Sequence, residues 1–419
     1  MASGKLDRKG AVLRTSISFL RGLACCLLTA GMCLSLHQAQ AGTPPPAAFY
    51  RPSDPLNAAA FDHFYNLDYD RAIDEFDQIL RRHPDDPFAV NHVCMAVLIR
   101  ELYRMGAMNT GEYANDSFIG QAHRPADPKA KERIRSLIER ATSLEEQRLK
   151  SNPNDVDTLY ARGSTRAQAS VYTGLVERAW FSALRSAVGA RHDHERVLEL
   201  NPNYVDAKLV VGTHNFVTGS LPLGVKMAVA LVGLSGSKEK GLQYLNEAAN
   251  ANSETRVDAE VLLSLFLRRE HRYEEALHIT QGLIPLYPRN LLFALEEGNL
   301  LRSLGRNQEA AAAYRKIWQS GKDGHYPGLH YEMAALSLGD LLRSEKDYGG
   351  AAAAYELVTQ VAQPDPEVQQ KANLGAGEMY DLLQKRDQAV RKYEAVVASD
   401  GNTSIGAKAR ELIKEPYRE

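Results

Sequence analysis

The sequence predicts an all-α protein, a solenoid of about eight stacked helical hairpins. Three observations lead to this fold class. A short helical motif recurs along the chain, and two of its copies, at Ala276 and Ala310, lie 34 residues apart. A small residue stands in the amphipathic stretch before each regular copy. The 419-residue chain is 44% hydrophobic and 24% charged, which is typical of a protein that buries a large core.

The recurring motif is an aromatic or polar residue, then Ala three residues later, then an aromatic residue and an apolar pair. Its copies begin at Tyr69, Tyr273, Asn307, Tyr348 and Arg386. Small residues such as Gly298 and Gly339 allow the two helices of a hairpin to approach closely, and the aromatic residue fills the space between hairpins. Pro84 and Pro288 end second helices, because proline cannot continue a helix. A single hairpin cannot bury both faces, so the hairpins must stack.

This pattern resembles the tetratricopeptide repeat, with its small residue, its Ala and aromatic positions and its closing proline. The resemblance implies a right-handed superhelix in which the first helix of each hairpin lines a concave groove. Less regular copies lie around Ala141, Ala190 and Gly241. We therefore expect repeats over residues 56–218 and 238–401, followed by a capping helix and tail over 402–419, with the helix near Ile405–Lys414.

The first 41 residues have the features of a secretory signal peptide. Basic residues precede a short apolar run, Leu23–Leu36, and cleavage is expected after Ala41. A mitochondrial presequence is the alternative, and a lipid anchor at Cys33 is disfavoured because Met32 precedes it. Residues 42–55 are Pro-rich and are predicted to form an extended linker. The mature chain would retain only Cys94, which we expect to be a buried thiol with no disulfide partner.

Two insertions interrupt the repeats. Residues 106–128 are polar and turn-rich, and are expected to form a loop within the second repeat. Residues 219–237 are apolar, but the run Leu221–Leu234 is too short to cross a membrane. It is expected either to be an extra buried helix or to offer a hydrophobic surface to lipid, a membrane or a partner helix. The surface would be formed by Leu221, Met227, Val229 and Leu231.

The same region resembles the tetratricopeptide-repeat-protein-39 group, which includes the yeast inclusion-body-clearance protein. The likeness rests on Leu221-Pro222, on Gly233–Gly236 and on Lys240-Gly241-Leu242 with Leu245. It implies an adaptor at a membrane or lipid surface with no assigned chemistry. The signal peptide of this chain departs from that cytosolic group.

No catalytic or cofactor motif is present in the sequence. His192–Glu195 is the only dense run of possible metal ligands, and neighbouring helix positions point to different faces, so a solvated helix face is expected there. We therefore predict a non-enzymatic protein with no metal and no cofactor. The 50 basic and 52 acidic residues give no basic excess for a nucleic-acid partner.

The predicted groove is the expected binding site. Arg268, Arg302 and Arg343 occupy one position, eight residues before the motif Ala, in three successive repeats, and Asn299 and Asp340 lie one turn earlier. Asn91, Tyr160 and Gln168 hold comparable places in earlier repeats. Arginine can bind a carboxylate or peptide carbonyl with two hydrogen bonds, although the same residues could simply keep the groove solvated. The sequence thus favours an exported scaffold for a protein or peptide partner, with a membrane or lipid adaptor as the alternative.

Overall fold

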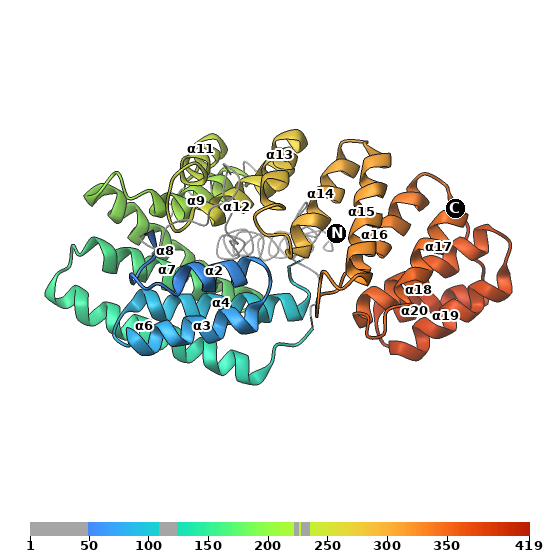
Figure 1. Ribbon diagram of the computed structural model, residues 1–419, viewed down its shortest axis with the longest axis horizontal. Coiled ribbons are helices and arrows are strands. Elements are labelled where there is room, and N and C mark those ends of the chain that lie inside the picture. Colours follow the sequence, from blue (N-terminus) through green and yellow to red (C-terminus); the bar gives the residue numbers. More distant parts are fainter. Residues whose placement is uncertain (1–48, 109–123, 222–225, 228–234) are drawn as a thin grey trace, which may run out of the picture. The chain divides into compact units, whose positions relative to one another are not determined.

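The computed structural model describes residues 49–108, 124–221, 226–227 and 235–419. Within these residues the chain forms seventeen α-helices and no strand, so the predicted all-α class is confirmed (Figure 1). The helices belong to two compact units, which we call unit 1 (residues 1–287) and unit 2 (residues 288–419). The predicted signal peptide, 1–41, lies outside the described residues.

Successive helices pair as antiparallel hairpins, as a tetratricopeptide-type solenoid requires. Those of unit 1 are α2 (Asn57–Tyr65) with α3 (Tyr69–Arg82), α4 (Pro87–Met105) with α6 (Pro128–Ser151), α7 (Val156–Val171) with α8 (Trp180–Leu200), α9 (Lys208–Gly219) with α11 (Lys238–Ala249), and α12 (Arg256–Arg269) with α13 (Tyr273–Leu283). Those of unit 2 are α14 (Leu291–Ser303) with α15 (Asn307–Lys322), α16 (Glu332–Ser344) with α17 (Tyr348–Val358), and α18 (Pro366–Leu382) with α19 (Arg386–Asp400), followed by α20 (Ser404–Lys414). The described residues thus contain eight hairpins and the expected final helix.

The motif residues make the closest contacts within each hairpin. The motif alanines Ala72, Ala276, Ala310, Ala351 and Ala389 are all fully buried. A Cβ atom on Gly298 would come within 2.4 Å of the Tyr314 ring, and one on Gly339 within 2.4 Å of the Tyr355 ring. Tyr355 also lies against Gly375 of the next hairpin. Glycine is therefore needed where the aromatic ring crosses the first helix, as the sequence predicted.

The turn inside each regular hairpin contains one residue with a left-handed backbone. It lies five residues before the motif Ala and is Leu67, His271, Gly305, Lys346 or Gln384. Only one of these five is glycine, so the tight turn is imposed by packing of the two helices and not by local preference. Left-handed backbone costs a residue with a side chain about 1–2 kcal/mol.

The predicted linker, 42–55, extends too far toward the C-terminus, because residues 49–55 are packed on unit 1. Tyr50 is buried and stacks on Phe61 with ring centroids 4.5 Å apart. Asp54 is buried and pairs with Arg82 at 2.6 Å. The proline content suggested an extended segment, but Phe49 and Tyr50 supply enough apolar surface to hold it on the helices. Residues 42–48 lie outside the described part of the chain.

The ends of unit 1 meet. The Tyr65 ring of α2 lies 5.2 Å from that of Tyr287, which follows α13. His92 of α4 contacts Glu254, in the loop before α12, at 2.8 Å. Residues far apart in sequence therefore share one interior in this unit.

Candidate functional site

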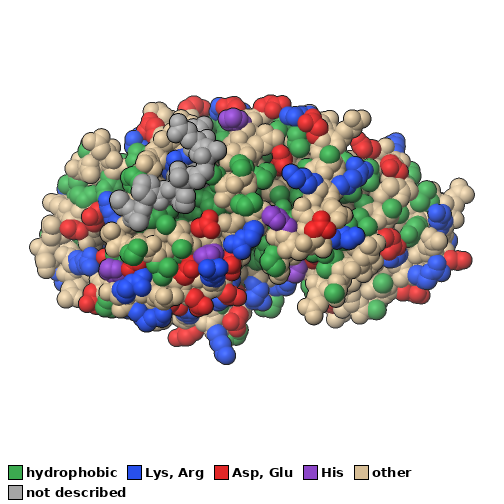
Figure 2. Space-filling view, viewed as in Figure 1, with side chains coloured by type: hydrophobic (Ala, Val, Ile, Leu, Met, Phe, Trp, Pro, Cys, Tyr) green, Lys and Arg blue, Asp and Glu red, His purple; other side chains and the backbone are tan. Residues whose placement is uncertain are grey.

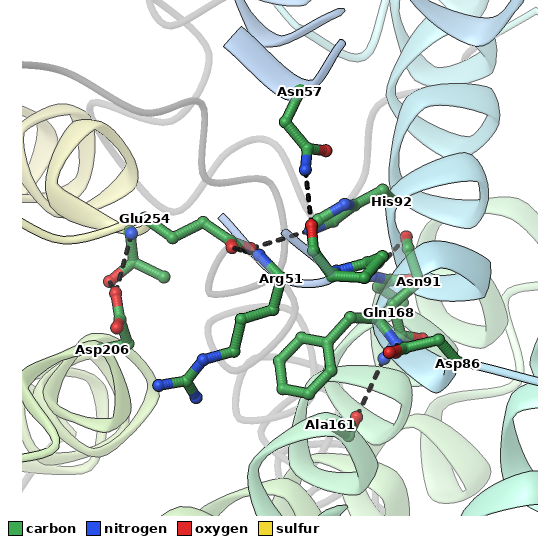
Figure 3. Close-up of polar contacts among 12 residues, drawn as sticks. Arg51, Asn57, Asp86, Asn91, His92, Ala161, Gln168, Asp206 and Glu254 are labelled. Carbon is green, nitrogen blue, oxygen red and sulfur yellow. Dashed lines mark hydrogen bonds and ion pairs between the residues drawn. The ribbon is translucent and has the colours of Figure 1, made fainter. Parts of the chain in front are cut away.

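The segment around Arg51 lies among residues from four parts of unit 1 (Figure 3). The Arg51 amide donates to Glu254 at 3.0 Å. Its guanidinium donates to Asp157 and to the Tyr204 hydroxyl, and lies 4.8 Å from the centre of the Tyr204 ring. This non-helical piece of the chain is thus held both by its backbone and by its side chains.

A cavity of about 310 Å³ lies beside this segment. Its lining includes Phe49, Arg51, Asn203, Tyr204, Asp206 and Ser253. Asp206 accepts hydrogen bonds from the amide and the hydroxyl of Thr255 at 2.9 and 2.8 Å. Sequence reasoning missed this site, because its residues come from loops that the repeat motif does not mark.

The structure brings three predicted groove residues of unit 1 together, and all three make contacts within the protein. Asn91 donates to the Ala161 carbonyl at 3.0 Å, and Gln168 donates to the Asn91 carbonyl at 3.1 Å (Figure 3). Tyr160 is buried between Phe88 and Tyr204. These side chains fasten α4 to α7, so they are not exposed to a partner as the sequence predicted. The physical reason is that the first helices α4 and α7 contact each other directly.

Next to Asn91 lies a buried carboxyl group, Glu145 of α6. It accepts a hydrogen bond from Thr165 at 2.5 Å, and burial raises its pKa to about 7. The sequence did hold a signal for its burial. Glu145 is four residues after Ala141 and four before Leu149, both expected to face the core.

In unit 2 the predicted polar residues lie on successive first helices. The tyrosine of each hairpin orients one of them through its hydroxyl group. Tyr314 donates to Asn299 at 2.8 Å, and Tyr355 donates to Asp340 at 2.7 Å. In the last hairpin Tyr393 donates to Asp381 at 2.9 Å. The motif tyrosines therefore position polar side chains in addition to filling the core, which the sequence analysis did not foresee.

Two of the three predicted arginines accompany this row. Arg302 of α14 is exposed and Arg343 of α16 is half-buried, and both interact electrostatically with Asp340. Arg268 is buried at the end of α12 and belongs to unit 1. We call Asn299, Arg302, Asp340, Arg343 and Asp381 the unit 2 inner face.

The end of the chain lies on this inner face, which the sequence analysis missed. Arg343 donates to the Tyr417 hydroxyl at 2.8 Å, and the Tyr417 amide donates to Asp381 at 2.8 Å. A short polar segment without helical periodicity carries no signal for such docking.

The apolar insertion is only partly described. Leu221 is packed against the protein, whereas Met227 is 61% exposed. Val229 and Leu231 lie outside the described residues, as does most of the predicted loop 106–128. In the part of the chain that the structure describes, no helix is long and apolar enough to cross a membrane.

Half of the run His192–Glu195 departs from the solvated face that was expected, because His192 is exposed but the next two residues are buried. Asp193 is buried and pairs with Arg162 and Arg166 at 2.5 and 2.6 Å. His194 is buried beside Gly163, and its burial lowers its pKa to about 4. Among the residues described, no three His, Cys, Asp or Glu side chains form a group that could hold a metal ion.

Charged side chains of both signs are interspersed over the face drawn in Figure 2. This distribution agrees with the near balance of 50 basic and 52 acidic residues.

No known family profile and no curated protein matches the chain. Among solved structures, PilF of Pseudomonas aeruginosa is 16% identical, with a TM-score of 0.34 over 59% of this chain and 98% of that one. A human IFIT1 dimer with m7Gppp-AAAA is 12% identical, with a TM-score of 0.40 over 94% and 87% of the two chains. A tetratricopeptide repeat protein from Parabacteroides merdae is 14% identical, with a TM-score of 0.27 over 86% and 96%. The chain's own architecture, eight described helical hairpins, identifies it as an all-α, tetratricopeptide-type repeat protein.

Proposed function

We propose that this protein is an exported, non-catalytic scaffold that binds an extended segment of a partner protein on the unit 2 inner face. The observation that carries the proposal is the row of polar side chains on α14, α16 and α18, each fixed by the tyrosine of its own hairpin. The leader, with its cleavage expected after Ala41, supports export.

The chemistry of the row suits a peptide backbone and its carboxylates. Arg302 and Arg343 offer planar groups that can donate two hydrogen bonds to one carboxylate or to neighbouring carbonyls. Asn299 can bind the peptide backbone as donor and acceptor. Because Tyr314 and Tyr355 already hold their partners in place, binding orders few side chains of the scaffold, which lowers its entropic cost.

The test is affinity capture from envelope extract with the mature protein, followed by mass spectrometry. The double variant Arg302→Ala/Arg343→Ala should lose the proteins that the unmodified protein captures, since each lost contact weakens binding by about ten-fold or more. The matched control is Arg315→Ala/Arg391→Ala, which removes two exposed arginines from the second helices α15 and α19. Capture that is the same for both double variants would contradict the proposal.

A second candidate is a membrane- or lipid-associated adaptor that acts through the apolar insertion. The observation in its favour is the exposed Met227 within an apolar stretch. The resemblance of this stretch to the tetratricopeptide-repeat-protein-39 group also favours it. Met227→Glu should then move the protein from the membrane fraction to the soluble fraction. Unchanged fractionation would remove this candidate.

A further inference from the structure

The final residues of the chain lie across the first helices of unit 2. After α20 the chain passes Asp381 of α18, reaches Arg343 of α16 and ends its contacts at Tyr348, whose hydroxyl donates to Glu419 at 2.7 Å. Tyr417 is the half-buried residue of this segment, and its neighbours Pro416 and Arg418 are exposed. We call residues 415–419 the tail.

Three parts of Tyr417 contact the protein: its hydroxyl group, its aromatic ring and its backbone amide. Its hydroxyl accepts a hydrogen bond from Arg343. Its ring lies 5.3 Å from the Arg343 guanidinium carbon and 5.7 Å from the Lys408 ammonium, within the range of a cation–π interaction. Its amide donates to Asp381. The hydroxyl and ring contacts together select tyrosine, whereas the amide contact is available to any residue except proline.

The residues that hold Tyr417 are fixed by the protein itself. Glu378 is buried and accepts from both Arg343 and Lys408 at 2.5 Å, so it places the two cations side by side. Asp381 accepts from Arg386 at 3.0 Å and from Tyr393 at 2.9 Å. None of these supporting contacts involves the tail, so the site does not depend on the tail for its shape.

We infer that this site binds a tyrosine-bearing extended segment of a partner, with an acidic residue two positions after the tyrosine, and that the tail occupies it in the absence of the partner. The inference rests on the proposed function and names the class of ligand. The acidic residue corresponds to Glu419, which meets Tyr348. A tethered segment acts at an effective concentration near the millimolar range, so a partner must bind more tightly than the tail peptide alone.

The experiment uses the tail itself as the probe. The mature protein is ended at Lys414, which retains α20, and a fluorescein-labelled peptide of sequence KEPYRE is titrated against it by fluorescence anisotropy. We expect the shortened chain to bind the peptide and the full chain to bind it at least ten-fold more weakly. Tyr→Phe in the peptide should weaken binding by about five-fold through the lost hydrogen bond, and Tyr→Ala should abolish it. Arg343→Ala in the shortened chain should abolish binding, whereas Arg315→Ala should not.

Cleavage by chymotrypsin after Tyr417 provides a second readout on the full chain. Docking should slow this cleavage, and Arg343→Ala should accelerate it several-fold while the helical circular dichroism is retained. An absence of peptide binding up to 1 mM (about the effective concentration of the tether), with equal cleavage rates, would overturn the inference.

The two proposals fail in different ways. In one outcome the shortened chain binds the peptide, but protein capture is the same with and without Arg302→Ala/Arg343→Ala. This result would support the tail contact and contradict the proposed partner-binding function. In the other outcome protein capture requires the two arginines, but the shortened chain does not bind the peptide. This result would support the proposed function and contradict the tyrosine specificity.

Discussion

Burial shifts the pKa values of individual titratable residues in unit 1. Glu145 and His194 are both inside, and burial shifts their pKa values toward the neutral form, up to about 7 for the acid and down to about 4 for the base. Their charged forms are therefore disfavoured in the fold. Cys94 is likewise buried, and burial raises the pKa of its thiol to about 12. Near neutral pH, His194 and Cys94 are therefore uncharged, and Glu145 is close to the midpoint of its titration.

Glu145→Gln should change how stability depends on pH. The folded pKa of about 7 lies above the ordinary 4.5, so the folded state binds the proton more tightly and the free energy of unfolding falls as pH rises from 4.5 to 7. Glutamine does not ionise, so the Glu145→Gln variant lacks this loss. Its free energy of unfolding, relative to that of the unmodified protein, should rise by up to about 3 kcal/mol between pH 4.5 and 7. Urea unfolding at several pH values measures it. Glu146→Gln, at the exposed neighbouring position, should show no such gain, and equal profiles for the two variants would refute the assignment.

Cys94 should be unreactive in the folded mature chain. A buried thiol with a raised pKa offers neither access nor thiolate. A disulfide reagent at pH about 8 (near the ordinary thiol pKa) should therefore modify no cysteine in native protein and one after guanidinium unfolding. Rapid modification of the native protein would show that the residue is exposed.

At the scale of the element, the five regular hairpins share a turn with one left-handed residue, and in four of them that residue carries a side chain. Gly305 meets this requirement without strain, whereas Lys346 and Gln384 adopt the same left-handed backbone with side chains. Tertiary contacts between the motif tyrosine and the glycine of the first helix must outweigh this cost. This contact is made in the hairpins of Gly305, Lys346 and Gln384, whereas the hairpins of Leu67 and His271 have no glycine in the first helix.

Two glycine substitutions should have opposite effects on stability. A Cβ on Gly305 or on Gly282 would meet no atom within 4 Å, so crowding does not enter. Gly305 has φ of 73°, and Gly305→Ala should destabilise by about 1 kcal/mol because alanine is strained there. Gly282 lies within α13, and Gly282→Ala should stabilise by about 1 kcal/mol through helix propensity. Chemical unfolding of both variants tests the pair, and the same sign for both would contradict the account.

At the scale of the whole molecule, residues 49–55 and the tail each dock on the unit to which they belong. Residues 49–55 link the start of unit 1 to its fourth and fifth hairpins, and the tail crosses the first helices of unit 2. Segments outside the hairpins thus contribute contacts to both units.

Tyr50→Ala should destabilise unit 1 strongly. Tyr50 is buried against Phe61 and anchors the segment that carries Arg51 to Glu254, so its loss should cost about 3 kcal/mol, as for other buried aromatics. Thermal and urea unfolding of the mature chain measure the loss. Phe181→Ala, at a position 72% exposed, should change stability by about 0.5 kcal/mol or less. A similar small effect for Tyr50→Ala would mean that the segment is not part of the folded unit.

Sequence periodicity alone is enough to predict the hairpins, the final helix and the placement of the unit 2 polar residues on first helices. These follow from spacings of three to eight residues, and helical geometry converts such spacings directly into faces. Asn299, Arg302, Asp340 and Arg343 lie on successive first helices for this reason.

Packing between hairpins, by contrast, sets which polar residues are buried and where the segments outside the hairpins dock. Asn91 turned inward because α4 meets α7, and Arg51 joined Glu254 across 203 residues of sequence. Such contacts depend on how hairpins stack and on how far unit 1 curves before its ends meet. No local pattern encodes these quantities, because they arise from the sum of many small packing rotations between neighbouring repeats.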